Sequence, residues 1–253
     1  MQAQRLPAVR GAFWLAAGFK LYRRNPPLLT TLTLGYMLIV FAFGMLQPVG
    51  QFILPLILPA LTVLLANGFR ALDLGNSKGF PAAALIEGLA EHRGALLRLG
   101  FLHLAGTLAV LALNFLLAGG KSSVSPGSGD ETAQLIQLLS LMALYSPLLL
   151  AFWFAPLLTT WEGLTAAKSL FFSFVAAWRN WRAFLVYGLA VMLVGALLPA
   201  LILFIASMIS KTLVEVLAVA LYTLLFLVFT PVLMTSAYLS YRDVFIQAPD
   251  GAS

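Results

Sequence analysis

The sequence predicts an all-α integral membrane protein with six transmembrane helices. Of its 253 residues, 61% are hydrophobic and only 9% are charged, whereas a soluble domain carries roughly a quarter charged residues. The mean hydropathy is +0.97. Apolar runs also recur along the chain at the length of a membrane span. So few charges cannot cover a water-facing surface, so we expect lipid to be the solvent for most of the chain.

Six apolar runs are long enough to cross about 30 Å of hydrocarbon. The first two are separated only by the turn Gln47-Pro48-Val49-Gly50-Gln51, which predicts a hairpin. The third and fourth flank the Gly/Ser-rich segment 119–131, and the last two are joined by a brief polar turn at 207–212. The six predicted spans are residues 28–46, 52–69, 99–118, 132–158, 184–208 and 213–237.

Three basic segments predict amphipathic helices that lie at the membrane surface. They are residues 11–24, 81–97 and 165–184. The signal is strongest in 165–184, where small and polar residues recur on one helical face and aromatic residues on the other. The first face holds Ser169, Ser173, Ala176 and Asn180. The second face holds Phe171, Phe174, Trp178 and Trp181.

The basic residues gather on one side of the predicted bundle. With six spans both termini lie on the same side, and only Lys121 and Lys211 of the 15 Lys and Arg fall on the other. The positive-inside rule therefore predicts a multi-pass protein of the bacterial inner membrane with cytoplasmic N- and C-termini.

The chain also suggests a threefold internal repeat of surface helix, span and span within a single membrane domain, residues 1–253. The predicted copies are residues 8–72, 80–162 and 165–243. Each copy has an aromatic ring before an arginine and a proline in its second span, namely Pro59, Pro156 and Pro231. The alternative explanation is that proline, aromatic and arginine residues recur at the interfaces of any membrane protein.

Catalytic chemistry is poorly represented in the sequence. There is no cysteine, and the two histidines, His92 and His103, fall on different elements. No His, Asp and Glu cluster has metal-ligand spacing. We therefore predict a protein that is not an enzyme, with no catalytic residue, no cofactor and no metal.

Two sets of residues are candidates for function. Basic and aromatic residues of the surface helices predict binding of anionic lipid headgroups or of a partner protein; these residues are Lys168, Trp178, Arg179, Trp181, Arg182, Arg23 and Arg93. Polar residues near the kink-forming prolines predict the lining of a central cavity; these residues are Thr62, Asn67, Thr159, Glu162 and Thr235.

A resemblance to known proteins rests on AFWFAPLL at 151–158, KSLFFS at 168–173, WRNWRAFLVYG at 178–188, the opening MQAQRLPA and the turn from Asp73 to Gly75. In these segments the sequence resembles an uncharacterised family of six-span bacterial inner-membrane proteins. The resemblance covers the whole chain and implies membrane class and topology. More distantly, the chain is similar to YciC-type proteins and to the membrane domains joined to glycerophosphodiester phosphodiesterases, which implies a connection with lipids.

Two functions follow as hypotheses. The first is a non-enzymatic membrane protein that binds anionic lipid or a partner protein and supports envelope homeostasis. The second is a transporter or channel for a small molecule or lipid along the pseudo-threefold axis. Nucleic acid is not an expected partner, because the basic residues sit beside apolar runs and not on a soluble face.

Overall fold

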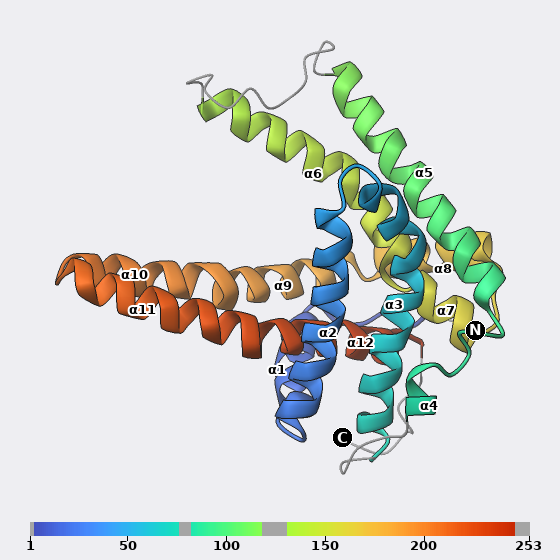
Figure 1. Cartoon of the computed structure of the whole chain (residues 1–253), viewed down its shortest axis with the longest axis horizontal. Coiled ribbons are helices and arrows are strands. Elements are labelled where there is room, and N and C mark those ends of the chain that lie inside the picture. The colour runs from blue at the N-terminus through green and yellow to red at the C-terminus, as the bar shows by residue number, and fades with distance from the viewer. Residues whose placement is uncertain (1–2, 76–81, 118–130, 246–253) are drawn as a thin grey trace. The chain divides into compact units, whose positions relative to one another are not determined.

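The structure is a computed structural model that describes residues 3–75, 82–117 and 131–245. Every regular element in these ranges is a helix (Figure 1). Six stretches are long and apolar enough to cross a membrane, which confirms the prediction of six spans. They are Pro26–Met45, Gly50–Asp73, Arg93–Leu117, Leu135–Trp161, Trp181–Ser207 and Lys211–Phe245.

The helices follow the predicted order closely. Their bounds are α1 Arg10–Tyr22, α2 Pro26–Met45, α3 Gly50–Asp73, α4 Ala82–Leu85, α5 Arg93–Leu117, α6 Glu131–Trp153, α7 Ala155–Trp161, α8 Ala166–Arg179, α9 Trp181–Met192, η1 Leu193–Leu197, α10 Leu198–Ser207, α11 Lys211–Leu224, η2 Leu225–Phe229 and α12 Thr230–Phe245. The elements η1 and η2 are single π-helical turns within the fifth and sixth spans.

The chain divides into two compact units. The first contains Met1–Phe41, Leu64–Glu87 and Arg179–Ser253, and the second contains Ala42–Val63 and Gly88–Trp178. The prediction of one domain built from three repeats remains a prediction.

In the first unit, α1 packs closely on α9 and α12. Two glycines one heptad apart make this approach feasible. A Cβ at Gly11 would overlap the backbone carbonyl of Ala183, and a Cβ at Gly18 would come within 2.8 Å of the Val232 carbonyl oxygen. Any larger residue at either position would push α1 away from its neighbours.

Trp14 fixes α1 in this position. Its side chain is only 1% exposed, and its ring meets those of Phe184 and Tyr187 edge-on at centroid distances of 5.3 and 5.9 Å. Its indole N–H donates to Asp243 Oδ2 at 3.1 Å. The helix predicted at 11–24 is therefore confirmed as a helix, and its tryptophan is buried in protein.

Each π-helical turn ends two residues before a proline. Pro199 follows η1 and Pro231 follows η2, and each lacks the N–H that would bond four residues back. For Pro231 the carbonyl left over is that of Leu227, which accepts hydrogen bonds from Thr30 Oγ1 at 3.1 Å and Tyr22 Oη at 3.4 Å. Neighbouring hydroxyls thus satisfy the freed carbonyl, as expected in a membrane.

In the second unit, the fourth span breaks between α6 and α7 at Phe154. The hydroxyl of Ser173, on α8, lies in the break: it accepts from Phe154 N–H and donates to the Leu150 carbonyl, both at 2.9 Å. One turn further on, Thr159 Oγ1 donates to Ser169 Oγ at 2.8 Å. The polar face predicted for this segment is thus buried against protein.

Two of the predicted surface helices need correction. The segment 81–97 is not one helix, because α4 covers only Ala82–Leu85 and turns follow up to α5. Gly88 there has φ +73°, a conformation that a helix cannot contain. Asn67 Nδ2 holds this turn by donating to the Leu85 and Glu87 carbonyls, both at 3.0 Å.

The segment 165–184 is also divided. α8 ends at Arg179, and Asn180 leaves helical geometry before α9 begins at Trp181. Trp181 and Arg182 therefore belong to the first turn of the fifth span and not to the surface helix. The apolar–polar periodicity continues through the break, which is why the sequence alone predicted one helix.

Candidate functional site

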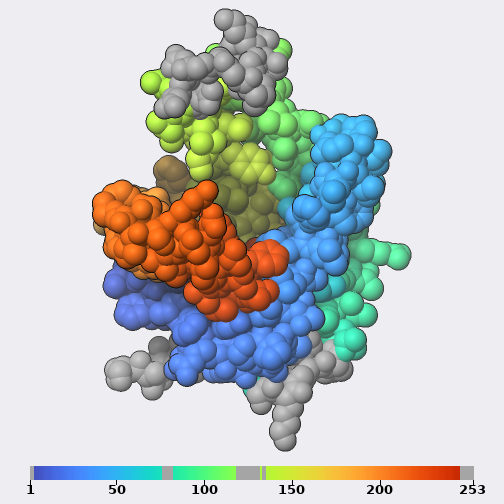
Figure 2. All heavy atoms as spheres, turned by 60° about the vertical axis from the view of Figure 1, so that its left-hand side comes forward, coloured from blue at the N-terminus to red at the C-terminus, as the bar shows by residue number. Residues whose placement is uncertain are grey.

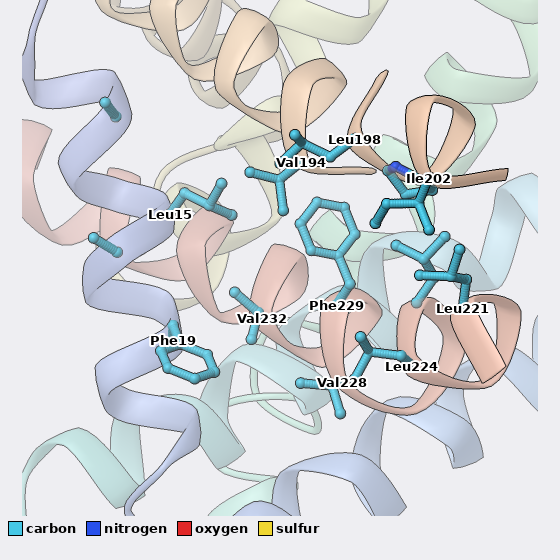
Figure 3. Close-up of a pocket in the computed structure, with 14 residues that line it drawn as sticks. Leu15, Phe19, Val194, Leu198, Ile202, Leu221, Leu224, Val228, Phe229 and Val232 are labelled. Carbon is cyan, nitrogen blue, oxygen red and sulfur yellow. The ribbon is translucent and has the colours of Figure 1, made fainter. Parts of the chain in front are cut away.

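An apolar cleft of about 630 Å³ lies in the first unit, between α1 and the paired fifth and sixth spans. Figure 3 shows Leu15 and Phe19 entering it from α1, opposite Val194 and Leu198. In Figure 2 the blue surface of the N-terminal residues borders the orange surface of this pair of spans. The lining is apolar throughout and consists of Ala12, Leu15, Ala16, Phe19, Val194, Leu198, Pro199, Ile202, Leu221, Leu224, Leu225, Val228, Phe229 and Val232.

The two π-helical turns both contribute to this cleft. Phe229 closes η2, and its ring points toward the opposite span (Figure 3). Gly195, in η1, faces that ring, since a Cβ there would come within 2.6 Å of it. The widened turns and the missing side chain at Gly195 give the aromatic ring its place beside the cleft.

A charged recess of about 310 Å³ adjoins the same helix, and Ala16 lines both spaces. Arg10, Lys20, Arg242 and Asp243 contribute its charged side chains. The recess therefore lies along the same stretch of α1 as the cleft but on a neighbouring face of the helix, and it is rich in cations.

Two carboxylates pair with the arginines of this region. Asp243 Oδ2 accepts from Arg10 Nε at 2.7 Å, and Asp73 Oδ2 accepts from Arg242 at 2.8 Å. Tyr238 Oη also donates to Asp73 Oδ2, at 3.0 Å. The Asp73 and Asp243 side chains are only 14% and 11% exposed. Ion pairs with such buried carboxylates fix the positions of their side chains, but they add little to the stability of the fold, because the cost of desolvating the charges offsets their attraction.

The residues predicted to bind lipid or a partner divide between the two units. Lys168, Trp178 and Arg93 belong to the second unit, and all three are exposed. Trp178 is 62% exposed and its ring stacks on Phe174 with a centroid distance of 6.0 Å. An exposed aromatic face on α8 is typical of a helix at headgroup depth.

The remaining predicted residues, Arg23, Arg179, Trp181 and Arg182, belong to the first unit and are exposed. Arg23 lies over the ring of the cleft residue Phe19, 6.0 Å from its centroid. Arg182 lies over the ring of Trp181 at 5.5 Å. Arg23 is therefore at the rim of the apolar cleft.

The residues predicted to line a central cavity have local roles in the structure. Thr62 Oγ1 donates to the Leu58 carbonyl at 2.9 Å and Thr235 Oγ1 to the Pro231 carbonyl at 2.7 Å. Thr159 and Asn67 make the contacts described above, and Glu162 is exposed at the end of α7. These residues come from both units, and their assembly into one cavity remains a prediction.

Sequence reasoning missed Asp73 and Asp243 as site residues. Asp243 meets Arg10 across 233 positions of sequence and Asp73 meets Arg242 across 169. One available signal was the scarcity of acidic residues, since the chain has only nine Asp and Glu in total. An acidic residue beside an apolar run in such a chain is a functional or structural candidate by default.

The described ranges contain no group of three His, Asp or Glu side chains placed to hold a metal ion. The prediction that the protein is not an enzyme remains a prediction.

A comparison with curated proteins finds one described as "Probable inner membrane protein BTH_II0599" of Burkholderia thailandensis. It is 32% identical over 271 aligned positions, which cover 98% of this chain and 96% of the relative. No protein-family profile and no solved structure matches the chain.

Proposed function

This chain belongs to the family of the Burkholderia inner-membrane protein, and on that premise we propose that it binds a membrane lipid in the cleft under α1. It is a polytopic helical protein of the bacterial inner membrane. The observation that carries the proposal is the cleft itself: about 630 Å³ lined only by apolar residues, with Lys20 in the adjoining recess and Arg23 over the cleft residue Phe19.

The apolar lining suits an acyl chain. Binding sites for small apolar ligands typically enclose 300–1,000 Å³ and are lined by aliphatic and aromatic side chains. The cleft has this volume, and its lining includes Phe19 from α1 and Phe229 from η2. The fit of an acyl chain to the shape of the cleft would favour binding there, because the surrounding lipid is as apolar as the cleft.

The cationic rim suits the headgroup. Arg23 lies over Phe19, and Lys20 lines the recess that shares Ala16 with the cleft. No carboxylate within the described ranges forms an ion pair with either cation. Guanidinium and ammonium groups near a headgroup favour anionic lipids by about 1 kcal/mol for each charge. We therefore propose an anionic phospholipid as the ligand.

The wider role follows from this binding. We propose a non-enzymatic protein that holds a lipid, with both termini in the cytoplasm, and whose exposed α8 face rests in the cytoplasmic leaflet. Trp178 and Lys168 on α8 then act as membrane anchors. Support of the cell envelope, through lipid or through a partner protein, is the corresponding physiological hypothesis.

The test is lipid retention by the full-length protein. Ala16→Trp places a bulky ring in the cleft from a position that carries only a methyl group. Val219→Trp is the matched control, because Val219 is 68% exposed on α11 and does not line the cleft. Native mass spectrometry of both variants extracted from membranes should show anionic phospholipid on the wild type and the Val219 variant, and much less on the Ala16 variant. Equal retention in all three proteins would count against the proposal.

A further inference from the structure

The N-terminal arm of the chain is fastened to the side chain of Asn180. This amide is 1% exposed. Its Nδ2 donates to the Gln4 carbonyl at 2.9 Å, and its Oδ1 accepts from the Leu6 N–H at 2.8 Å. Gln4 N–H also donates to the Val244 carbonyl at 3.0 Å. Arg5 lies between the two anchored residues, so its side chain projects from a fixed backbone.

The fastened arm creates a second recess, of about 330 Å³, lined by residues 5–8 and 179–182. Three of these residues are arginines, namely Arg5, Arg179 and Arg182, and none is acidic. All three are exposed, and no carboxylate in the described part of the chain forms an ion pair with them. The recess thus combines a high positive charge with a fixed backbone.

Three uncompensated guanidinium groups around one recess repel one another, so a bound anion would lower the free energy of the arrangement. The guanidinium fork matches two oxygens of a phosphate at once. Arg182 is further oriented by the ring of Trp181, which lies 5.5 Å from its charged carbon. A phosphate offers enough oxygens for several forks, whereas a carboxylate has only two.

We propose that this recess binds a phosphate group, presented either by an anionic phospholipid or by free phosphate. The inference goes beyond the lipid site under α1, because it rests on different residues and does not require the apolar cleft. It also assigns a role to the N-terminal arm: Asn180 holds the arm in place, and Arg5 is thereby positioned as the third arginine of the recess.

The experiment uses the full-length protein in nanodiscs. A triple variant, Arg5→Gln with Arg179→Gln and Arg182→Gln, removes the charge of the recess. The control triple, Arg24→Gln with Arg98→Gln and Lys211→Gln, removes the same charge from exposed positions that belong to neither proposed site. Two probes are applied to each protein. Inorganic phosphate is titrated in phosphatidylcholine discs while thermal unfolding is followed, and retained phosphatidylglycerol is quantified after mixed-lipid reconstitution.

The wild type and the control triple should respond to one probe, and the recess variant should bind that probe about tenfold more weakly, as expected for lost charge-assisted hydrogen bonds. A response to inorganic phosphate identifies free phosphate as the ligand, and a response only in phosphatidylglycerol retention identifies the lipid headgroup. The single variant Arg5→Gln, whose side chain is exposed, should weaken the same response. Equal responses in the wild type and the recess variant, or an equal loss in the control triple, would overturn the inference.

Discussion

The hydroxyl of Ser173 lies within 2.9 Å of the backbone nitrogen of Phe154 and takes the place of a helical acceptor there. The same hydroxyl donates to the Leu150 carbonyl, so one side chain satisfies both backbone groups that the break between α6 and α7 sets free. An apolar bilayer offers no water to do this instead. The contact with α8 thereby fixes the position of the break in the fourth span.

Ser173→Ala should destabilise the protein by about 1–3 kcal/mol, because the buried Phe154 N–H loses the hydroxyl that accepts from it at 2.9 Å. Thermal or denaturant unfolding in detergent micelles would measure the loss. Ser146→Ala is the control, since the Ser146 hydroxyl is exposed and bonds only to the Ala143 carbonyl of its own helix. If the two variants lose equal stability, the Ser173 hydroxyl does not hold the break.

A second prediction concerns Asp243, the carboxylate that holds α1. Asp243→Ala removes the acceptor of both Arg10 and Trp14 and should cost about 1.5–3 kcal/mol, the range for hydrogen bonds to a charged group. Glu215→Ala is the control, because Glu215 is 65% exposed and pairs with Lys211 at 3.9 Å, an interaction worth about 0–1 kcal/mol. Unfolding curves that coincide for the two variants would contradict this account of α1.

A third prediction concerns the π-helical turn before Pro231. Tyr22→Phe combined with Thr30→Val removes both hydroxyls that donate to the Leu227 carbonyl. An unsatisfied carbonyl in hydrocarbon should cost about 1–3 kcal/mol. Tyr222→Phe, at an exposed position of α11, should leave the unfolding midpoint unchanged. An unaltered midpoint in the double variant would show that the carbonyl does not need these donors.

Much of the fold could be predicted from the sequence, because the signal for a membrane span comes from neighbouring residues. A run of apolar residues is recognisable without knowing what it packs against, and amphipathic periodicity predicts helices at α1 and α8. The break at Asn180 could not be predicted in this way, because its amide is committed to the backbone of Gln4 and Leu6, at the other end of the chain.

The candidate site was harder to predict, because it too depends on contacts between segments that are far apart in the sequence. The sequence identified Arg23, whose side chain lies at the rim of the cleft, but not the cleft itself, which needs α1 beside two spans from the far end of the chain. The sequence placed Ser169 and Ser173 on one helical face, but it did not show which helix this face packs against. Their buried hydrogen bonds identify α6 and α7 as that neighbour.

The topology gives a fourth prediction. A reporter that is active only in the cytoplasm should be silent when inserted at 122–130 and active when fused after residue 253, because 13 of the 15 Lys and Arg fall on the predicted cytoplasmic side. A periplasm-specific reporter at the same two positions should give the opposite pattern. Cytoplasmic activity of the insertion at 122–130 would overturn the orientation.

The most direct measurement of the central claim is photo-crosslinking with phosphatidylglycerol that carries a diazirine on its acyl chain, in liposomes containing the full-length protein. If a lipid occupies the cleft, adducts should concentrate on residues such as Leu15, Phe19 and Val228, and Ala16→Trp should abolish this enrichment. Val216 and Val219, which are 62% and 68% exposed on α11, report the background labelling by bulk lipid. Labelling of the cleft at the level of these two valines, unchanged in the Ala16 variant, would contradict the account.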